Sequence, residues 1–100
     1  MKINGLEAKR ASRQEINDTA LMGYAYIPYA TLREKLGEPT DWKMDKVACE
    51  WALVVDGEIV TIYAWKVASA ESCVVWNIGG KGRIALDAVR VLFPHHTVTR

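Results

Sequence analysis

Two segments rich in β-branched and aromatic residues, 47–55 and 58–67, flank Asp56-Gly57. Alternation with a period of two is typical of strands, and Asp-Gly tolerates the positive φ angles of a two-residue hairpin turn. We therefore predict an antiparallel hairpin whose register is set by its turn. Its predicted core face carries Cys49, Trp51, Leu53, Val55, Val60, Ile62 and Ala64. Its other face carries Ala48, Glu50, Ala52, Val54, Ile59, Thr61, Tyr63 and Trp65, with Glu50 opposite Tyr63 and Ala48 opposite Trp65.

Two further segments carry apolar residues at helical spacing. The first follows Pro28 and ends at Gly37, a residue suited to a helix C-terminus; its apolar positions are Tyr29, Leu32 and Leu36. The second ends before Pro94, and its stripe comprises Ile84, Ala85, Ala88, Val89 and Leu92. Strands are also expected in 19–27, with a bulge or a close backbone approach at Gly23, and in 73–78.

These elements predict an α+β fold, a small antiparallel sheet of three to four strands with a central Asp-Gly hairpin and two helices packed on one face. Residues 1–18 are polar and mixed in charge, which favours an arm, a short helix over 7–16, or a first short strand at 2–6. Residues 19–94 form the single predicted domain, and residues 95–100 form a tail.

The net charge, the cysteines and the absence of long apolar stretches limit the kinds of function that we expect. The net charge is +1, from 13 Lys+Arg against 12 Asp+Glu, which argues against general nucleic-acid binding. Cys49 and Cys73 lack a C-x-x-C spacing, so we expect them to be reduced and buried. The start of the chain lacks the apolar region of a signal peptide, and no stretch approaches the roughly 20 apolar residues of a membrane span. We therefore expect a cytoplasmic protein without a membrane partner.

Two places suggest binding chemistry. The segment Gly79-Gly80-Lys81-Gly82-Arg83 lies between a predicted strand and helix, where backbone N–H groups and two cations favour a phosphate or another anion. A solvated turn is the alternative. On the second face of the hairpin, Glu50, Tyr63 and Trp65 suit a planar ligand or a protein interface. The alternative there is that a helix or the N-terminal arm covers the face.

The pattern does not favour catalysis. The two histidines, His95 and His96, are adjacent in the predicted tail, where neighbouring side chains point apart and chelate a metal poorly. Neither cysteine has a histidine base nearby in the expected layout, and no pair of carboxylates stands out as an acid–base couple. We expect a protein that is not an enzyme and that uses no cofactor and no metal.

Four short motifs occur in order along the chain. They are Leu36-Gly37-Glu38-Pro39-Thr40-Asp41, Glu50-Trp51, Ile62-Tyr63-Ala64-Trp65-Lys66 and Trp76-Asn77-Ile78-Gly79-Gly80. Over roughly residues 21–92 the chain resembles a family of small bacteriophage and prophage proteins with G-E-P, E-W, I-Y-x-W-K and W-H-I-G-G motifs. Asn77 stands where that family shows histidine, and the asparagine still forms hydrogen bonds.

The resemblance implies a phage-encoded binding protein in the host cytoplasm that inhibits a host defence system. The first hypothesis is an anti-CRISPR-like inhibitor that binds a host protein such as a CRISPR-Cas component. The second is a sponge for a cyclic-nucleotide or other nucleotide immune signal, in which Lys81, Arg83 and the Gly79-Gly80 backbone hold phosphates while Trp65, Tyr63 or Trp76 stacks a base. The third is a virion assembly accessory. An uncovered aromatic sheet face also favours a homodimer.

Overall fold

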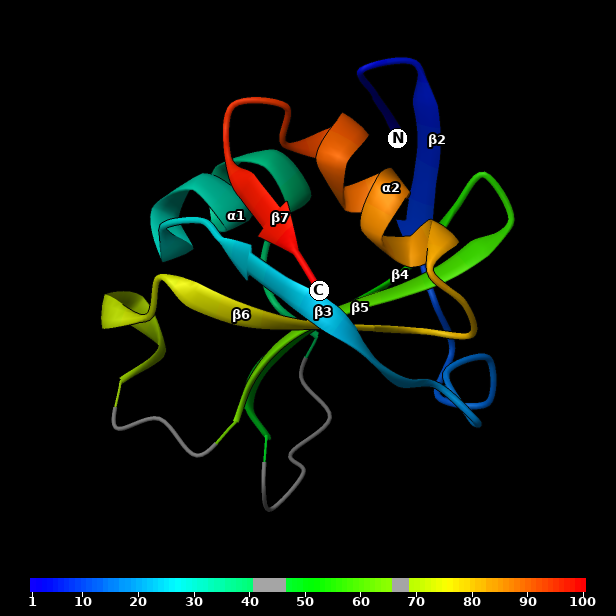
Figure 1. Cartoon of the computed structure of the whole chain (residues 1–100), viewed down its shortest axis with the longest axis horizontal. Coiled ribbons are helices and arrows are strands. Elements are labelled where there is room, and N and C mark those ends of the chain that lie inside the picture. Colours follow the sequence, from blue (N-terminus) through cyan, green and yellow to red (C-terminus); the bar gives the residue numbers. More distant parts are fainter. Residues whose placement is uncertain (41–46, 66–68) are drawn as a thin grey trace.

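The computed structural model describes residues 1–40, 47–65 and 69–100, with the side chains of residues 47, 48 and 65 excepted. Seven strands form one twisted sheet (Figure 1). They are β1 (Lys2–Ile3), β2 (Leu6–Arg10), β3 (Ala20–Tyr26), β4 (Val47–Val55), β5 (Glu58–Trp65), β6 (Val75–Gly80) and β7 (Thr97–Thr99). The helices are α1 (Tyr29–Leu36), α2 (Ile84–Leu92) and the one-turn 3-10 helix η1 (Ala70–Ser72).

The order of strands across the sheet is β1-β2-β4-β5-β6-β3-β7, and every pair of neighbours is antiparallel. The prediction of a three- to four-stranded sheet was therefore wrong. The additional strands are β1, β2 and β7, and they come from the segments expected to be an arm and a tail. β1 and β7 are the edge strands and β2 lies between β1 and β4. All three bury few side chains, so the hydrophobic pattern carries little sign of them.

The hairpin is formed as expected. Asp56 and Gly57 have φ angles of 47° and 83° at the turn, as a two-residue loop requires. Glu50 pairs with Tyr63, Trp51 with Ile62 and Leu53 with Val60. One expected pair is wrong: Trp65 pairs with Val47 rather than Ala48, because the register shifts between Val47 and Cys49.

The remaining elements mostly follow the patterns, but Ile84, expected on the apolar stripe of the second helix, is 51% exposed. Pro28 precedes α1, and Gly37, with a φ of 85°, donates its N–H to the Arg33 carbonyl at the helix end. The register of β3 shifts between Leu21 and Gly23. A Cβ atom at Gly23 would lie 2.2 Å from the Thr99 carbonyl oxygen, so this glycine allows both the bulge and the close approach of β7.

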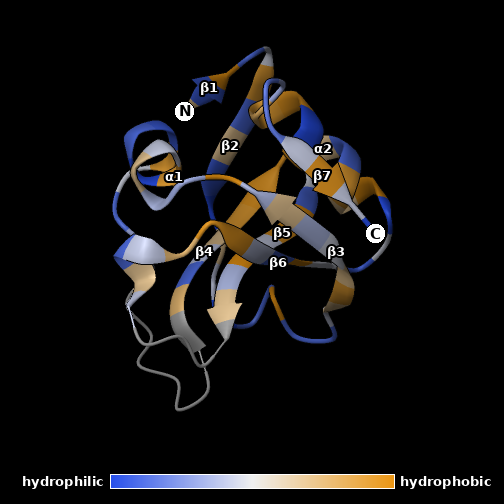
Figure 2. Cartoon of the chain, turned by 60° about the vertical axis from the view of Figure 1, so that its left-hand side comes forward, coloured by the Kyte–Doolittle hydropathy of each residue, from blue (hydrophilic) through white to orange (hydrophobic). Residues whose placement is uncertain are grey.

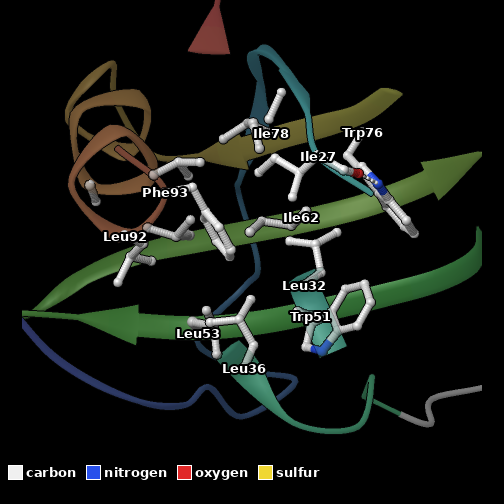
Figure 3. Packing of buried hydrophobic residues seen from close by; sticks show 14 of the residues in the cluster. Ile27, Leu32, Leu36, Trp51, Leu53, Ile62, Trp76, Ile78, Leu92 and Phe93 are labelled. Atoms are coloured by element: carbon white, nitrogen blue, oxygen red, sulfur yellow. Dashed lines mark hydrogen bonds between the residues drawn. The ribbon is translucent and has the colours of Figure 1, made fainter. Parts of the chain in front are cut away.

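Both helices pack on one face of the sheet, where the main core forms (Figures 1 and 3). The hydropathy colouring is mostly hydrophobic along the hairpin strands and mixed along β2 (Figure 2). All seven residues of the predicted hairpin core face belong to this core. The helices contribute Leu32, Leu36, Ala85, Leu86, Ala88, Val89 and Leu92.

Two tryptophans join the sheet to the backbone on either side of α1. The Trp76 indole donates a hydrogen bond of 2.9 Å to the Ile27 carbonyl before the helix. The Trp51 indole donates one of 2.9 Å to the Gly37 carbonyl after it. Arg10, at the end of β2, donates to the carbonyls of Leu36 and Glu38 in the same region. The position of α1 is thereby defined from both ends.

Both cysteines are free, with Cys49 buried and Cys73 half-buried. Burial raises the pKa of the Cys49 thiol to about 11, which disfavours the nucleophilic thiolate. Among the residues described, no helix has the length and apolar character needed to cross a membrane.

The role of β2 in the core can be tested at Ala8, which is fully buried and pairs with Val55. Ala8→Asp should lower the free energy of unfolding by about 3 kcal/mol or more, because it buries an unpaired charge. Urea unfolding measures this change. The control is Lys9→Ala on the exposed side of the same strand. An equal, small effect of both variants would show that this segment is a dispensable arm.

Candidate functional site

The face of the sheet opposite the helices, called the outer face below, is partly covered by residues 11–18. Ala11 and Ile16 pack against Ala52, Val54 and the half-buried Ile59. A helix over residues 7–16 was one expectation for this region, and it was wrong, because residues 6–10 form β2 and residues 13–18 form turns. The alternative that the N-terminal arm covers the outer face is confirmed for these positions on β4.

Reciprocal hydrogen bonds hold the covering segment in its turn. The Ser12 amide donates to the Glu15 carboxylate at 2.8 Å, and the Glu15 amide donates to the Ser12 hydroxyl oxygen at 3.1 Å. These contacts lower the pKa of the Glu15 carboxyl, and the nearby positive charges of Lys9 and Lys81 lower it further. The turn of the covering segment is therefore stabilised by its own hydrogen bonds.

Beyond the covering segment, one row of residues crosses five strands of the outer face. The pairing places Glu50 of β4 beside Tyr63 of β5, then Asn77 of β6, Tyr24 of β3 and Thr99 of β7. Residues paired across antiparallel strands share a face of the sheet. The sequence predicted the contact between Glu50 and Tyr63, and the sheet order extends it.

A cleft of about 420 Å³ lies between this row and the covering segment. Its lining residues are Arg13, Ile16, Asn17, Thr19, Ala20, Leu21, Glu50, Thr61, Tyr63 and Gly79. The volume falls in the range of sites for small ligands or single side chains. The covering segment, Thr19 and β3 form one wall, which has both polar and apolar residues, and polar residues of β4 and β5 form the other.

Gly79 is necessary for the floor of this cleft. A Cβ atom at this position would lie 2.3 Å from the Thr61 hydroxyl oxygen and 3.4 Å from the Tyr63 ring. Two heavy atoms cannot approach to 2.3 Å without bonding, so any side chain at Gly79 would displace Thr61. The glycine therefore allows β5 and β6 to carry the buried Thr61 hydroxyl at the floor.

Glu50 is the unusual group in the cleft. The residue is only 8% exposed, and burial raises the pKa of its carboxyl. Burial also raises the pKa of the Tyr63 hydroxyl, with smaller contributions from the negative charge of Glu50 and from Tyr24. Among the described residues, none forms a hydrogen bond or ion pair with the Glu50 carboxylate. Such a group accepts hydrogen bonds from a donor that enters the cleft.

Four of the nine site residues expected from the sequence lie together here. Glu50, Tyr63 and Gly79 line the cleft, and Asn77 is the next residue of the row. The backbone of Trp65 extends the same strand, while its side chain is outside the description. Glu50, Tyr63, Asn77 and Gly79 therefore form the part of the predicted site that lies together on the outer face.

The other four expected residues lie elsewhere. Trp76 is fully buried in the core, where its indole bonds Ile27. Gly80 is buried in β6, and a Cβ atom there would lie 2.6 Å from Ala85 Cβ. Lys81 and Arg83 are exposed in the connection to α2. Because β6 continues through Gly80, the first two glycines serve close packing in the sheet rather than an open loop around a phosphate.

Sequence reasoning missed the residues of the opposite wall. Arg13 and Asn17 reach the cleft because the covering segment folds back over the sheet, and Leu21 lines it from β3. Tyr24 joins the row because β3 pairs with β6, which is distant in sequence. Thr61 was placed on the correct face of the hairpin, but its position beside Gly79 depends on the pairing of β5 with β6, which the sequence did not indicate.

The packing of Gly79 against Thr61 predicts a coupled effect of two substitutions. Gly79→Ala should cost about 1–3 kcal/mol in stability, because its methyl group overlaps the Thr61 hydroxyl. In a Thr61→Ala background the cost should fall by about 0.5 kcal/mol or more. Chemical denaturation of the four proteins measures this coupling. Gly82→Ala is the control, since its Cβ atom meets nothing within 4 Å; an equal cost of Gly79→Ala in both backgrounds would contradict the geometry.

The burial of Glu50 predicts a pH-dependent effect of Glu50→Gln. The pKa of this carboxyl is raised above its ordinary 4.5 in the folded state, so the folded protein binds the proton more tightly than the unfolded chain. Stability is therefore lost as the pH rises above 4.5 through the folded-state pKa. Glu50→Gln should stabilise the protein near pH 7 and much less near pH 4. Thermal unfolding measures both, with Glu34→Gln on the exposed side of α1 as the control; a constant difference across this range would contradict the prediction.

Comparison with known proteins does not assign a family or a function to this chain. No family model, no curated protein and no solved structure matches the chain. The resemblance to small bacteriophage proteins therefore stays a prediction, and the function is argued from the outer face and its cleft.

Proposed function

We propose that this protein is a non-enzymatic binding protein that docks a partner protein on its outer face. The observation that carries the proposal is a group of exposed aromatic and aliphatic side chains on neighbouring strands. Tyr24 and Tyr26 of β3 are 36% and 47% exposed, and Val75 of β6, the partner of Tyr26, is 46% exposed. Exposed apolar groups collected on one surface are typical of interaction sites.

The position of these residues on the sheet supports a protein partner. They adjoin the row of Glu50, Tyr63 and Asn77, so apolar contacts and hydrogen-bonding groups lie side by side on one surface. Tyrosine is enriched among the residues that dominate protein interfaces. The near-neutral net charge of the chain also argues against general nucleic-acid binding.

The resemblance to small bacteriophage proteins supplies the biological context of the proposal. The partner is a host defence protein such as a CRISPR-Cas component, and binding blocks its action in the host cytoplasm. A nucleotide sponge would hold phosphates with the backbone of Gly79-Gly80 in an open turn, but both residues belong to β6 and are paired with β3 and β5. A protein partner is therefore the better supported of the two hypotheses.

The proposal is tested by phage infection of bacteria that carry defined defence systems. Expression of the wild-type chain should restore phage plating by about tenfold or more against one system, while Tyr24→Ser with Tyr26→Ser should abolish this protection. The matched control is Val91→Ser, which removes an aliphatic side chain with 42% exposure from α2. Thermal unfolding verifies that both variants are folded.

Two results would contradict the proposal. One is full protection by the folded tyrosine variant, because the outer face would then be unnecessary. The other is calorimetric binding of a cyclic di- or trinucleotide that Lys81→Ala with Arg83→Ala abolishes, which would support the sponge. A homodimer that buries the outer face would be detected by sedimentation as a mass change in the same tyrosine variant.

A further inference from the structure

The cleft beside the outer face contains a carboxylate that the described part of the chain leaves without a partner. Glu50 is more than nine-tenths buried, yet it lines an open cleft together with Thr61 and Tyr63. Burial of most of this residue removes much of the water that would otherwise hydrate its charge, and this loss is costly to a folded protein. The cost is offset when a ligand supplies the donors, so this position points to a ligand rather than to a structural role.

The groups around Glu50 define the chemistry of that ligand. They offer two carboxylate oxygens, the Thr61 hydroxyl and the ring of Tyr63, which pairs with Glu50 across the strands. A planar cation with several N–H donors matches this set, because it forms paired hydrogen bonds with a carboxylate and packs its face against an aromatic ring. A guanidinium group has all of these properties, whereas an ammonium group has no planar face.

The position of the cleft indicates where the guanidinium comes from. The wall of the cleft includes Leu21, which is exposed on the same strand as Tyr24 and Tyr26. A side chain from a partner docked on the outer face would enter the cleft directly. We propose that the cleft receives an arginine side chain of the partner protein. The guanidinium group lies against Glu50, with its deepest N–H groups near Thr61 and its planar face beside the Tyr63 ring. This inference rests on the proposed function of the outer face.

Arg13 allows a test of whether the ligand is a cation or an anion. It lines the same cleft from the exposed covering segment. A cationic ligand is repelled by this charge, whereas the phosphate of a nucleotide would be attracted by it. Removal of the Arg13 charge should therefore affect the two ligand classes in opposite directions.

The experiment titrates the full chain with N-acetyl-arginine amide and follows the backbone amide signals of Thr61, Tyr63 and Gly79 by NMR. The neutral isostere, N-acetyl-citrulline amide, is the ligand control. We expect saturable shifts with a Kd in the millimolar range, about tenfold weaker binding of the citrulline compound, and about tenfold weaker binding of arginine amide to Glu50→Gln. Arg13→Gln should strengthen the binding of arginine amide.

Several results would overturn the inference. The first is an absence of shifts at about 50 mM arginine amide, a concentration well above the Kd expected for such a contact. The second is equal binding of the citrulline compound, and the third is binding of arginine amide to Glu50→Gln that is as tight as to the wild-type chain. Binding of guanosine monophosphate that Arg13→Gln weakens would assign the cleft to a nucleotide instead. If arginine amide fails to bind while Tyr24→Ser with Tyr26→Ser still abolishes protection, this inference falls and the proposed function stands. If arginine amide binds through Glu50 while that variant still protects, the cleft assignment holds and the proposed docking surface falls.

Discussion

Two hydrogen bonds from buried indoles organise the rest of this structure. Trp76 bonds the carbonyl of Ile27 just before α1, and Trp51 bonds the carbonyl of Gly37 just after it. The two rings meet edge to face with their centroids 5.4 Å apart, and Tyr29 at the start of α1 lies against both. A buried indole N–H or carbonyl left unpaired would be costly. These bonds therefore define the distance of α1 from β4 and β6 and the orientation of both tryptophans.

The fixed tryptophans also position the candidate site, because successive residues of a strand point to opposite faces. Three of the motifs that carry the resemblance each supply one buried residue and one residue of the outer row. In Glu50-Trp51, Ile62-Tyr63 and Trp76-Asn77, the core member is fully buried and its neighbour faces outward. The packing of the core thus aligns the groups of the outer face. Rigid support of this kind is what a binding site on a small domain requires.

Two glycines of β6 allow close packing on the two faces of the sheet. Gly80 allows α2 to approach β6 through Ala85, and Gly79 allows the Thr61 hydroxyl to reach the floor of the cleft. Neither residue has a positive φ, so both are required by space rather than by backbone conformation. A glycine-rich segment before a helix resembles a phosphate loop in sequence, but here its first two glycines are packing positions of a strand.

The sequence by itself determined the hairpin, its turn, most of its register and the helices after Pro28 and before Pro94, because these depend on local periodicity and on the conformational preferences of Gly and Pro. It also placed Glu50 and Tyr63 together, since a two-residue turn defines which residues pair. Only the tertiary structure decided the roles of β1, β2 and β7, whose residues show little hydrophobic pattern because they add few side chains to the core. It likewise decided the cleft, because Arg13 and Tyr24 reach Glu50 through contacts between segments distant in sequence, and local preferences carry no information about such contacts.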